Sequence, residues 1–214
     1  FYLGRDGDYR HGSMYSVYGM YSGLSARSTD SSTAIAGADE REDLGDLENS
    51  TAGRMNLFIN RGGDMLKELV EKKHYRFVEG AKDWREAIRM SCEVLESDGT
   101  VEENYKEDII KCVEKYGSYI VLMPGLAMPH CQEGAQGVHK TEIAFMRLEH
   151  PVSFEPGDPD KDAVLFFTFA SCNPDQHLDN MARLSEILSN DELIAELKEA
   201  KGPEDLIALE EKYL

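Results

Sequence analysis

The sequence has no long apolar stretch and is poor in basic residues. Its longest unbroken apolar runs are short pieces such as 163–167, far below the roughly 20 residues that a membrane-spanning helix needs. Lys and Arg number 23 against 41 Asp and Glu, which gives a formal net charge of -18. A chain of that sign binds phosphate backbones and anionic lipid poorly. We therefore expect no direct membrane insertion and no nucleic-acid partner.

Cysteine is also scarce, and its spacing excludes a disulfide-rich framework. The four cysteines form no C-x-x-C pair, and no charged-then-apolar signal segment is present. They are Cys92, Cys112, Cys131 and Cys172. A reducing compartment suits scattered thiols, so we expect the protein to be cytoplasmic.

The signatures of several catalytic classes are missing as well. The sequence contains no G-x-S-x-G nucleophile elbow and no G-x-x-x-x-G-K-[ST] phosphate loop. Its possible soft metal ligands fall into no zinc spacing. These ligands are Cys131, His139, His150, Cys172 and His177. We expect no cofactor, neither a metal ion nor a bound nucleotide.

Composition divides the chain near residue 54. Residues 1–54 combine interleaved Tyr and Gly with a Ser-, Thr-, Ala- and acid-rich stretch and offer little to bury, so we expect a flexible tail or linker there. Docking of the tyrosines on a neighbouring domain or subunit is the alternative. The start at Phe1 suggests a piece of a longer polypeptide, such as a fused permease. Residues 55–214 have the regular pattern of one folded domain.

Within 55–214 the hydrophobic pattern predicts helices alternating with a few buried strands, which indicates an α/β fold. The pattern leaves the strand order open. One helix is expected to turn Tyr116 inward and another to turn Leu178 inward. Helices are expected to begin at Asp64, Asp83 and about Glu102, with later ones near 178–188, 191–200 and 203–211; extended segments are expected at 75–78, 119–123, 141–148 and 163–170, and a proline-stiffened loop at 124–130.

The most informative position is His130, which follows a predicted strand and the loop 124–130. Such a loop presents an imidazole with little freedom to move. A neutral imidazole, with an ordinary pKa of about 6.5, is a competent nucleophile near pH 7 and suits the acceptance and transfer of a phosphoryl group. A hydrogen-bonded structural histidine in a turn is the equally weighted alternative.

A second candidate, His177, lies in the first turn of a predicted helix after a buried strand. Free backbone N–H groups and the helix dipole attract anions at such a position, so a phosphoryl group on His130 could be held there. This pairing requires the two strand ends to lie side by side. Helix capping is the alternative role. For Cys131, beside His130, a small apolar filler is favoured over a redox or ligand residue.

Four segments together resemble a known family. They are Tyr119 to His130, Gly137 to Thr141, Pro151 to Phe154, and Asp175 to Leu178. In this order and spacing they resemble the enzyme IIA domains of the bacterial phosphotransferase system (PTS), in the mannitol/fructose superfamily, and most of all its ascorbate-type branch. The similarity covers about residues 64–214.

The resemblance implies a mixed central sheet of about five strands flanked by helices. It also implies a phosphoryl relay, in which the phosphocarrier HPr phosphorylates His130 and enzyme IIB, acting with membrane enzyme IIC, receives the phosphoryl group for sugar uptake. The second histidine of such sites corresponds to His177, which would stabilise the transferred group. The family requires no metal or nucleotide.

The sequence departs from the family where His-Ala-Arg-Pro is often found. Here His130 is followed by Cys131, Gln132 and Glu133, so a positive charge is missing near the site. Two alternatives therefore remain: a regulatory relative that signals through its phosphorylation state, and a degenerate scaffold that no longer accepts phosphate. We expect a mostly apolar docking face with a few local basic residues such as Lys140.

Overall fold

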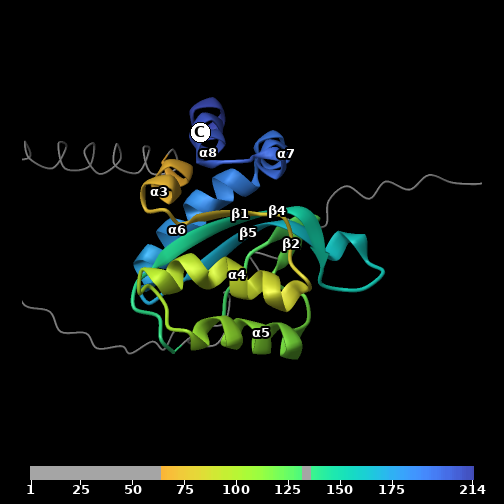
Figure 1. Cartoon of the computed structure of the whole chain (residues 1–214). Helices are drawn as coiled ribbons and strands as arrows, with labels where there is room; N and C mark the ends of the chain where they lie inside the picture. Colours follow the sequence, from red (N-terminus) through yellow and green to blue (C-terminus); the bar gives the residue numbers. More distant parts are fainter. Residues whose placement is uncertain (1–63, 132–135) are drawn as a thin grey trace, which may run out of the picture. The chain divides into compact units, whose positions relative to one another are not determined.

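The computed structural model describes residues 64–131 and 136–214. A central sheet separates two layers of helices (Figure 1). The predictions for residues 1–54 and for the departure at Gln132 fall outside the described residues. Among the described helices, none is both long enough and apolar enough to cross a membrane.

The sheet has five strands in the order β1-β4-β5-β3-β2. Strand β1 pairs parallel with β4, and β3 pairs parallel with β5, whereas the pairs β4–β5 and β2–β3 are antiparallel. The predicted mixed sheet is therefore confirmed. The strands are β1 (Tyr75–Val78), β2 (Val121–Met123), β3 (Gly125–Ala127), β4 (Glu142–Ser153) and β5 (Asp162–Ala170).

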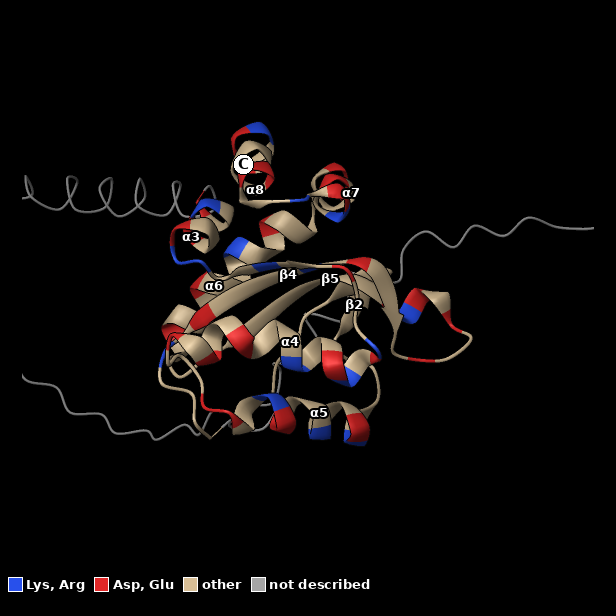
Figure 2. Ribbon diagram, in the orientation of Figure 1, with Lys and Arg blue, Asp and Glu red and all other residues tan. Residues whose placement is uncertain are grey.

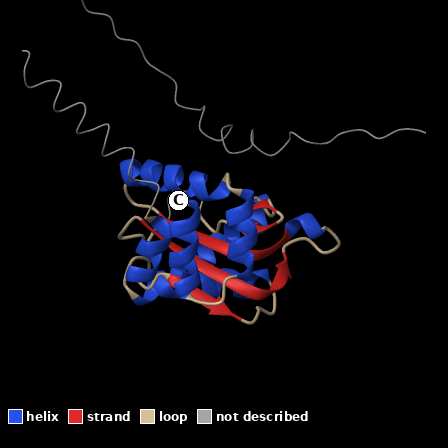
Figure 3. Ribbon diagram, turned by 90° about the horizontal axis from the view of Figure 1, so that it is seen from above, coloured by secondary structure: helices blue, strands red, loops and turns tan. Residues whose placement is uncertain are grey.

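Each face of the sheet is covered by its own helices, because successive side chains of a strand point to opposite faces. Along β5, Phe166 packs into the core beneath α4 and α5, while Phe167 packs into the core beneath α3, α6, α7 and α8. In Figure 3, seen from above, helices lie across the strands of the sheet. The helices are α3 (Met65–Glu71), α4 (Trp84–Ser97), α5 (Asn104–Tyr116), α6 (Pro174–Leu188), α7 (Asp191–Glu199) and α8 (Pro203–Tyr213), with a short 3₁₀ turn η2 (Pro159–Lys161).

Polar contacts define where two helices begin. The Asp83 side chain accepts a hydrogen bond from the Glu86 amide at 2.9 Å, which caps α4 as the sequence predicted. At α3 the Asp64 side chain makes no capping hydrogen bond. The buried Glu210 carboxylate of α8 instead accepts from the amides of Leu66 and Lys67, and this contact joins the start of α3 to the C-terminal helix.

The strand predictions need two corrections. Part of the predicted loop 124–130 is the short strand β3 (Gly125–Ala127), because Gly125 turns the chain at φ 87° and lets it pair with β5. Of the predicted segment 141–148, residues 142–148 belong with Val152 to one strand, β4, whose pairing shifts register between Arg147 and Val152. Pro151 lies in that irregular stretch, where its missing N–H removes a ladder hydrogen bond.

Two side chains that were predicted to point inward are exposed. Tyr116 is 41% exposed and Leu178 is 67% exposed. Tyr116 is the last residue of α5. In α6 the buried residues, Leu184 and Ile187, lie in the second half of the helix, so the first half, which carries Leu178, is not packed into the core. Helical periodicity gives the face of a residue but not how far along the helix the core extends.

Candidate functional site

The site forms where β3 and β5 end. These strands are parallel neighbours, with Leu126 opposite Leu165 and Ala127 opposite Phe166, so their C-terminal ends meet at one edge of the sheet. The pairing continues past β3, because the Phe169 amide donates to the Pro129 carbonyl at 2.9 Å. The chain thus reaches His130 from β3 and α6 from β5 at the same edge, which is the condition that the sequence left open.

The ring of His130 is held in one orientation by backbone and aromatic contacts. Its Nδ1 lies 2.8 Å from the Met128 carbonyl oxygen. A carbonyl oxygen can only accept, so Nδ1 carries the proton and the lone pair of the neutral imidazole resides on Nε2. The Tyr119 hydroxyl donates to the His130 carbonyl at 2.6 Å, and the two rings meet edge to face with centroids 5.2 Å apart.

His177 is positioned by the capped start of α6. The Asn173 side chain accepts from the amides of Asp175 at 3.0 Å and Gln176 at 3.1 Å, and Pro174 occupies the first turn of the helix. The imidazole of His177 packs edge to face on Phe169, with ring centroids 4.8 Å apart. The same Phe169 bonds to Pro129 through its backbone, so one residue of β5 contacts both sides of the site.

The backbone amides at the start of α6 are already engaged. Besides the two that bond to the Asn173 side chain, the His177 amide donates to the Asn173 carbonyl at 2.9 Å, and Pro174 has no N–H. The expectation that free amides of this turn would bind a phosphoryl group is therefore wrong. What remains for an anion is the partial positive charge of the helix terminus and the imidazole of His177.

Burial keeps both imidazoles neutral. Desolvation lowers the pKa of His130; the Met128 carbonyl opposes that change, and the charge of His177 adds to it. Desolvation also lowers the pKa of His177. The two rings are therefore close enough to interact electrostatically. A neutral His130 has an available lone pair near pH 7, which is the state that a nucleophile needs.

The turn between β5 and α6 is fixed by Thr141, the residue just before β4. The Thr141 hydroxyl accepts from the amides of Cys172 and Asn173 at 3.0 and 3.1 Å.

Lys140, the basic residue expected at a docking face, donates to the Asp98 carbonyl at 3.1 Å. More generally, charged residues gather on the helices and the strands are mostly uncharged (Figure 2).

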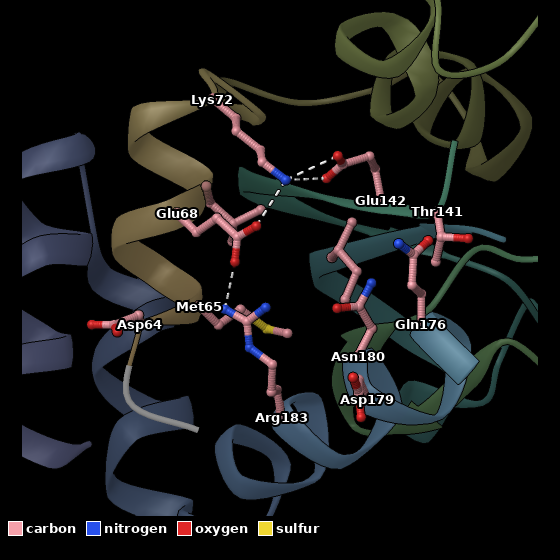
Figure 4. A pocket seen from close by; sticks show the side chains of 12 residues that line it. Asp64, Met65, Glu68, Lys72, Thr141, Glu142, Gln176, Asp179, Asn180 and Arg183 are labelled. Atoms are coloured by element: carbon pink, nitrogen blue, oxygen red, sulfur yellow. Dashed lines mark hydrogen bonds and ion pairs between the residues drawn. The ribbon is translucent and has the colours of Figure 1, made fainter. Parts of the chain in front are cut away.

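A pocket of ≈ 420 Å³ lies beside this turn, between α3, the start of β4 and α6 (Figure 4). Its cations are paired: Lys72 contacts Glu68 and Glu142 at 2.7 Å, and Arg183 contacts Glu68 at 2.6 Å. An entering anion would have to compete with these carboxylates. Neither His130 nor His177 lines the pocket, so we do not assign the phosphoryl chemistry to it. Over residues 64–131 and 136–214, no three His, Cys, Asp or Glu side chains converge as metal ligands would.

Sequence reasoning missed the residues that orient the two histidines. Tyr119 was interpreted as the first residue of a buried strand, yet it precedes β2 and bonds to His130. Phe169 was interpreted as an ordinary strand residue. Neither has a local signal, because their contacts join residues that are distant in the sequence.

Comparison with known proteins places the chain in a family. The model of the family "Phosphoenolpyruvate-dependent sugar phosphotransferase system, EIIA 2" matches residues 68–212, within the predicted domain 55–214. Over 142 residues the chain is 30% identical to the ascorbate-specific PTS system EIIA component of Shigella boydii serotype 4 (strain Sb227), covering 66% of this chain and 91% of that protein.

A second relative, the mannitol-specific cryptic phosphotransferase enzyme IIA component of Escherichia coli (strain K12), is 33% identical over 141 residues, covering 66% of this chain and 94% of that protein. The solution structure of the mannitol-specific cryptic phosphotransferase enzyme IIA CmtB from Escherichia coli matches with a TM-score of 0.57 and 31% identity, over 64% of this chain and 91% of that chain. These matches confirm the family resemblance and its fold. The chain belongs to the EIIA 2 family of the phosphoenolpyruvate-dependent sugar phosphotransferase system.

Proposed function

We propose that the protein is a phosphocarrier that accepts a phosphoryl group from phospho-HPr on His130 and passes it to an enzyme IIB. Membrane enzyme IIC then couples this transfer to the uptake and phosphorylation of an ascorbate-like sugar. The observation that carries the proposal is that His130 and His177 follow two parallel neighbouring strands, β3 and β5, at one edge of the sheet, with burial lowering the pKa of both imidazoles. Membership of the EIIA 2 family supports it.

The hydrogen bond at Nδ1 supports Nε2 as the reacting atom. The Nε2 lone pair of His130 attacks the phosphorus of the donor phosphohistidine, so the Nε2–P bond forms as the donor N–P bond breaks. The proton stays on Nδ1, which donates a hydrogen bond to the Met128 carbonyl throughout, and the electron pair of the broken bond returns to the donor ring. In the onward step the nucleophile of enzyme IIB attacks the same phosphorus, and His130 leaves with its lone pair restored.

His177 stabilises the transferred group. Because the amides of the first turn of α6 are occupied, the imidazole and the helix dipole are the groups left to interact with the phosphoryl oxygens. Contact with Phe169 fixes the ring at the rim of the site. This role predicts that a variant without the imidazole folds but transfers more slowly.

The test is labelling from phosphoenolpyruvate with purified enzyme I and HPr. Wild-type protein takes up acid-labile, base-stable label, and ³¹P NMR of that species reports a phosphorus on Nε2. His130→Ala takes up none, whereas the control His139→Ala, which removes an exposed imidazole paired with Glu102, labels normally. Labelling that persists in His130→Ala would exclude the assignment.

Onward transfer tests the partner and the sugar. Purified enzyme IIB should discharge the labelled protein, and a sugar panel in reconstituted membranes should show ascorbate as the preferred substrate. Both an ascorbate-specific and a mannitol-specific protein are among the relatives, so mannitol is the comparison that decides. Transfer to mannitol alone contradicts the ascorbate assignment, and no labelling under donor excess indicates a scaffold.

A further inference from the structure

Two cysteines meet beside His130. Cys112, in the last part of α5, is 8% exposed, and Cys131, the residue after His130, is partly exposed. Their sulfur atoms lie 3.4 Å apart, and no disulfide joins them. The two residues are distant in the sequence, so the contact is a product of the fold.

The backbone on both sides of this contact is fixed. Tyr105, about two turns before Cys112 on α5, hydrogen-bonds to the backbone of Cys131, and its hydroxyl donates to the Phe169 carbonyl. Tyr119 holds the His130 carbonyl and also hydrogen-bonds to Cys112. These hydrogen bonds hold the two thiols side by side and tie the backbone next to Cys131 to the rest of the fold.

The other two cysteines differ from this pair. Cys92 is completely buried, and burial raises the pKa of its thiol to about 12. Cys172 is exposed, and its sulfur lies 3.8 Å from the Thr141 hydroxyl.

We propose that Cys112 and Cys131 form an oxidant-sensitive modification site that closes to a disulfide and slows phosphoryl transfer at His130. Cys131 was predicted from the sequence to be a small apolar filler, and this proposal gives it a chemical role. The disulfide itself is independent of the proposed function, whereas its effect on transfer rests on it.

The oxidant is a hydroperoxide, and the reaction balances. The sulfur of the more accessible Cys131 attacks the terminal peroxide oxygen; the O–O bond breaks, and an alcohol, or water from hydrogen peroxide, leaves. The Cys112 sulfur then attacks the resulting sulfenic acid, the S–O bond breaks, and a second water leaves. The two thiols lose two electrons and two protons in total, and the peroxide is reduced.

Closure changes the geometry next to His130. The sulfur atoms must approach from 3.4 Å to about 2.05 Å. Because the Cys131 amide is linked directly to the His130 carbonyl that Tyr119 holds, this approach pulls on the residue that presents the nucleophile. A displacement of about 1 Å at a reacting group can cost up to about 100-fold in rate, and we expect at least a tenfold loss here.

The first experiment detects the bond in the full chain, without phosphorylation. Protein treated with hydrogen peroxide should lose two hydrogen atoms in intact mass, protect two thiols from alkylation, and give a reductant-sensitive peptide linking Cys112 to Cys131. Cys172→Ser, the control, should form the same bond. In Cys112→Ser a dimedone-trapped sulfenic acid should accumulate on Cys131. No bond, or bonds mainly to Cys172, would overturn the proposal.

The second experiment measures labelling from phospho-HPr before and after oxidation. Oxidised wild type should label at least tenfold more slowly and recover with dithiothreitol, while Cys131→Ser should be unaffected by peroxide. Equal rates in the oxidised and reduced forms would overturn the effect on transfer. Failure of the reduced protein to label would instead contradict the proposed function, since the disulfide is measured separately.

Discussion

Replacement of Tyr119 by phenylalanine removes one hydroxyl and tests how far the orientation of His130 depends on it. The hydroxyl donates to the His130 carbonyl at 2.6 Å, whereas the edge-to-face ring contact at 5.2 Å does not need it. Tyr119→Phe therefore keeps the aromatic packing and leaves a partly buried carbonyl without this donor.

The expected loss of stability follows from the free-energy cost of leaving the His130 carbonyl without its donor. A typical hydrogen bond contributes about 1 kcal/mol net, and an unsatisfied buried partner costs about 1–3 kcal/mol. We expect the free energy of unfolding to fall by about 1–2 kcal/mol. If about 1.4 kcal/mol of this is lost in presenting the ring, the transfer rate falls about tenfold.

The assay is single-turnover phosphorylation by phospho-HPr at saturating donor, with HPr affinity measured separately. Tyr119→Phe should lower the transfer rate with little change in HPr affinity, because the hydroxyl is engaged within the protein. The matched control is Tyr116→Phe. The ring centroids of Tyr116 and Tyr119 lie 6.4 Å apart, but Tyr116 is 41% exposed. A wild-type rate in Tyr119→Phe, or an equal loss in Tyr116→Phe, would refute the reasoning.

Two further predictions concern the electrostatics and the helix that carries His177. Burial, and to a smaller extent the charge of His177, lower the pKa of His130 below its usual 6.5. The NMR titration midpoint of the His130 ring should therefore lie below 6.5, and it should rise in His177→Gln. A midpoint at or above 6.5 contradicts this prediction. Folding favours the neutral His130 ring. The stability that this ring contributes is therefore fully present above pH 6.5 and is lost as the pH falls from 6.5 through the lower pKa of the folded state. Asn173→Ala should lower the free energy of unfolding by about 1 kcal/mol, measured by thermal melting, and should also slow phosphoryl transfer. The control Asn190→Ala removes the equivalent cap of α7 and should lower stability alone. Equal transfer rates in the two variants would contradict a positioning role for Asn173.

Local patterns were sufficient for most elements. The strand at Tyr75–Val78 and the helix capped by Asp83 lie where the sequence predicted them, because alternation, periodicity and capping act over a few residues. The same local rules failed at Leu178, which is exposed. Burial depends on what covers a helix, and that is a property of distant segments.

The chemical candidates, His130 and His177, came from the sequence, as did the family. Residues 1–54 and the boundary of the domain 55–214 stay predictions. The relation between the two histidines required the fold: only the parallel pairing of β3 with β5 brings their strand ends to one edge, and hydrophobic periodicity contains no information about strand order.

Sequence alone thus supplied the proposed reacting group, because an imidazole is the side chain whose ordinary pKa leaves it a neutral nucleophile near pH 7. Tertiary structure decided which ring nitrogen is available, through the Met128 carbonyl, and which pKa the ring adopts, through burial. It also brought Cys112 within 3.4 Å of Cys131. Contacts of this kind depend on distances between segments remote in the chain, which the packing of the sheet and its helices sets and no local pattern encodes.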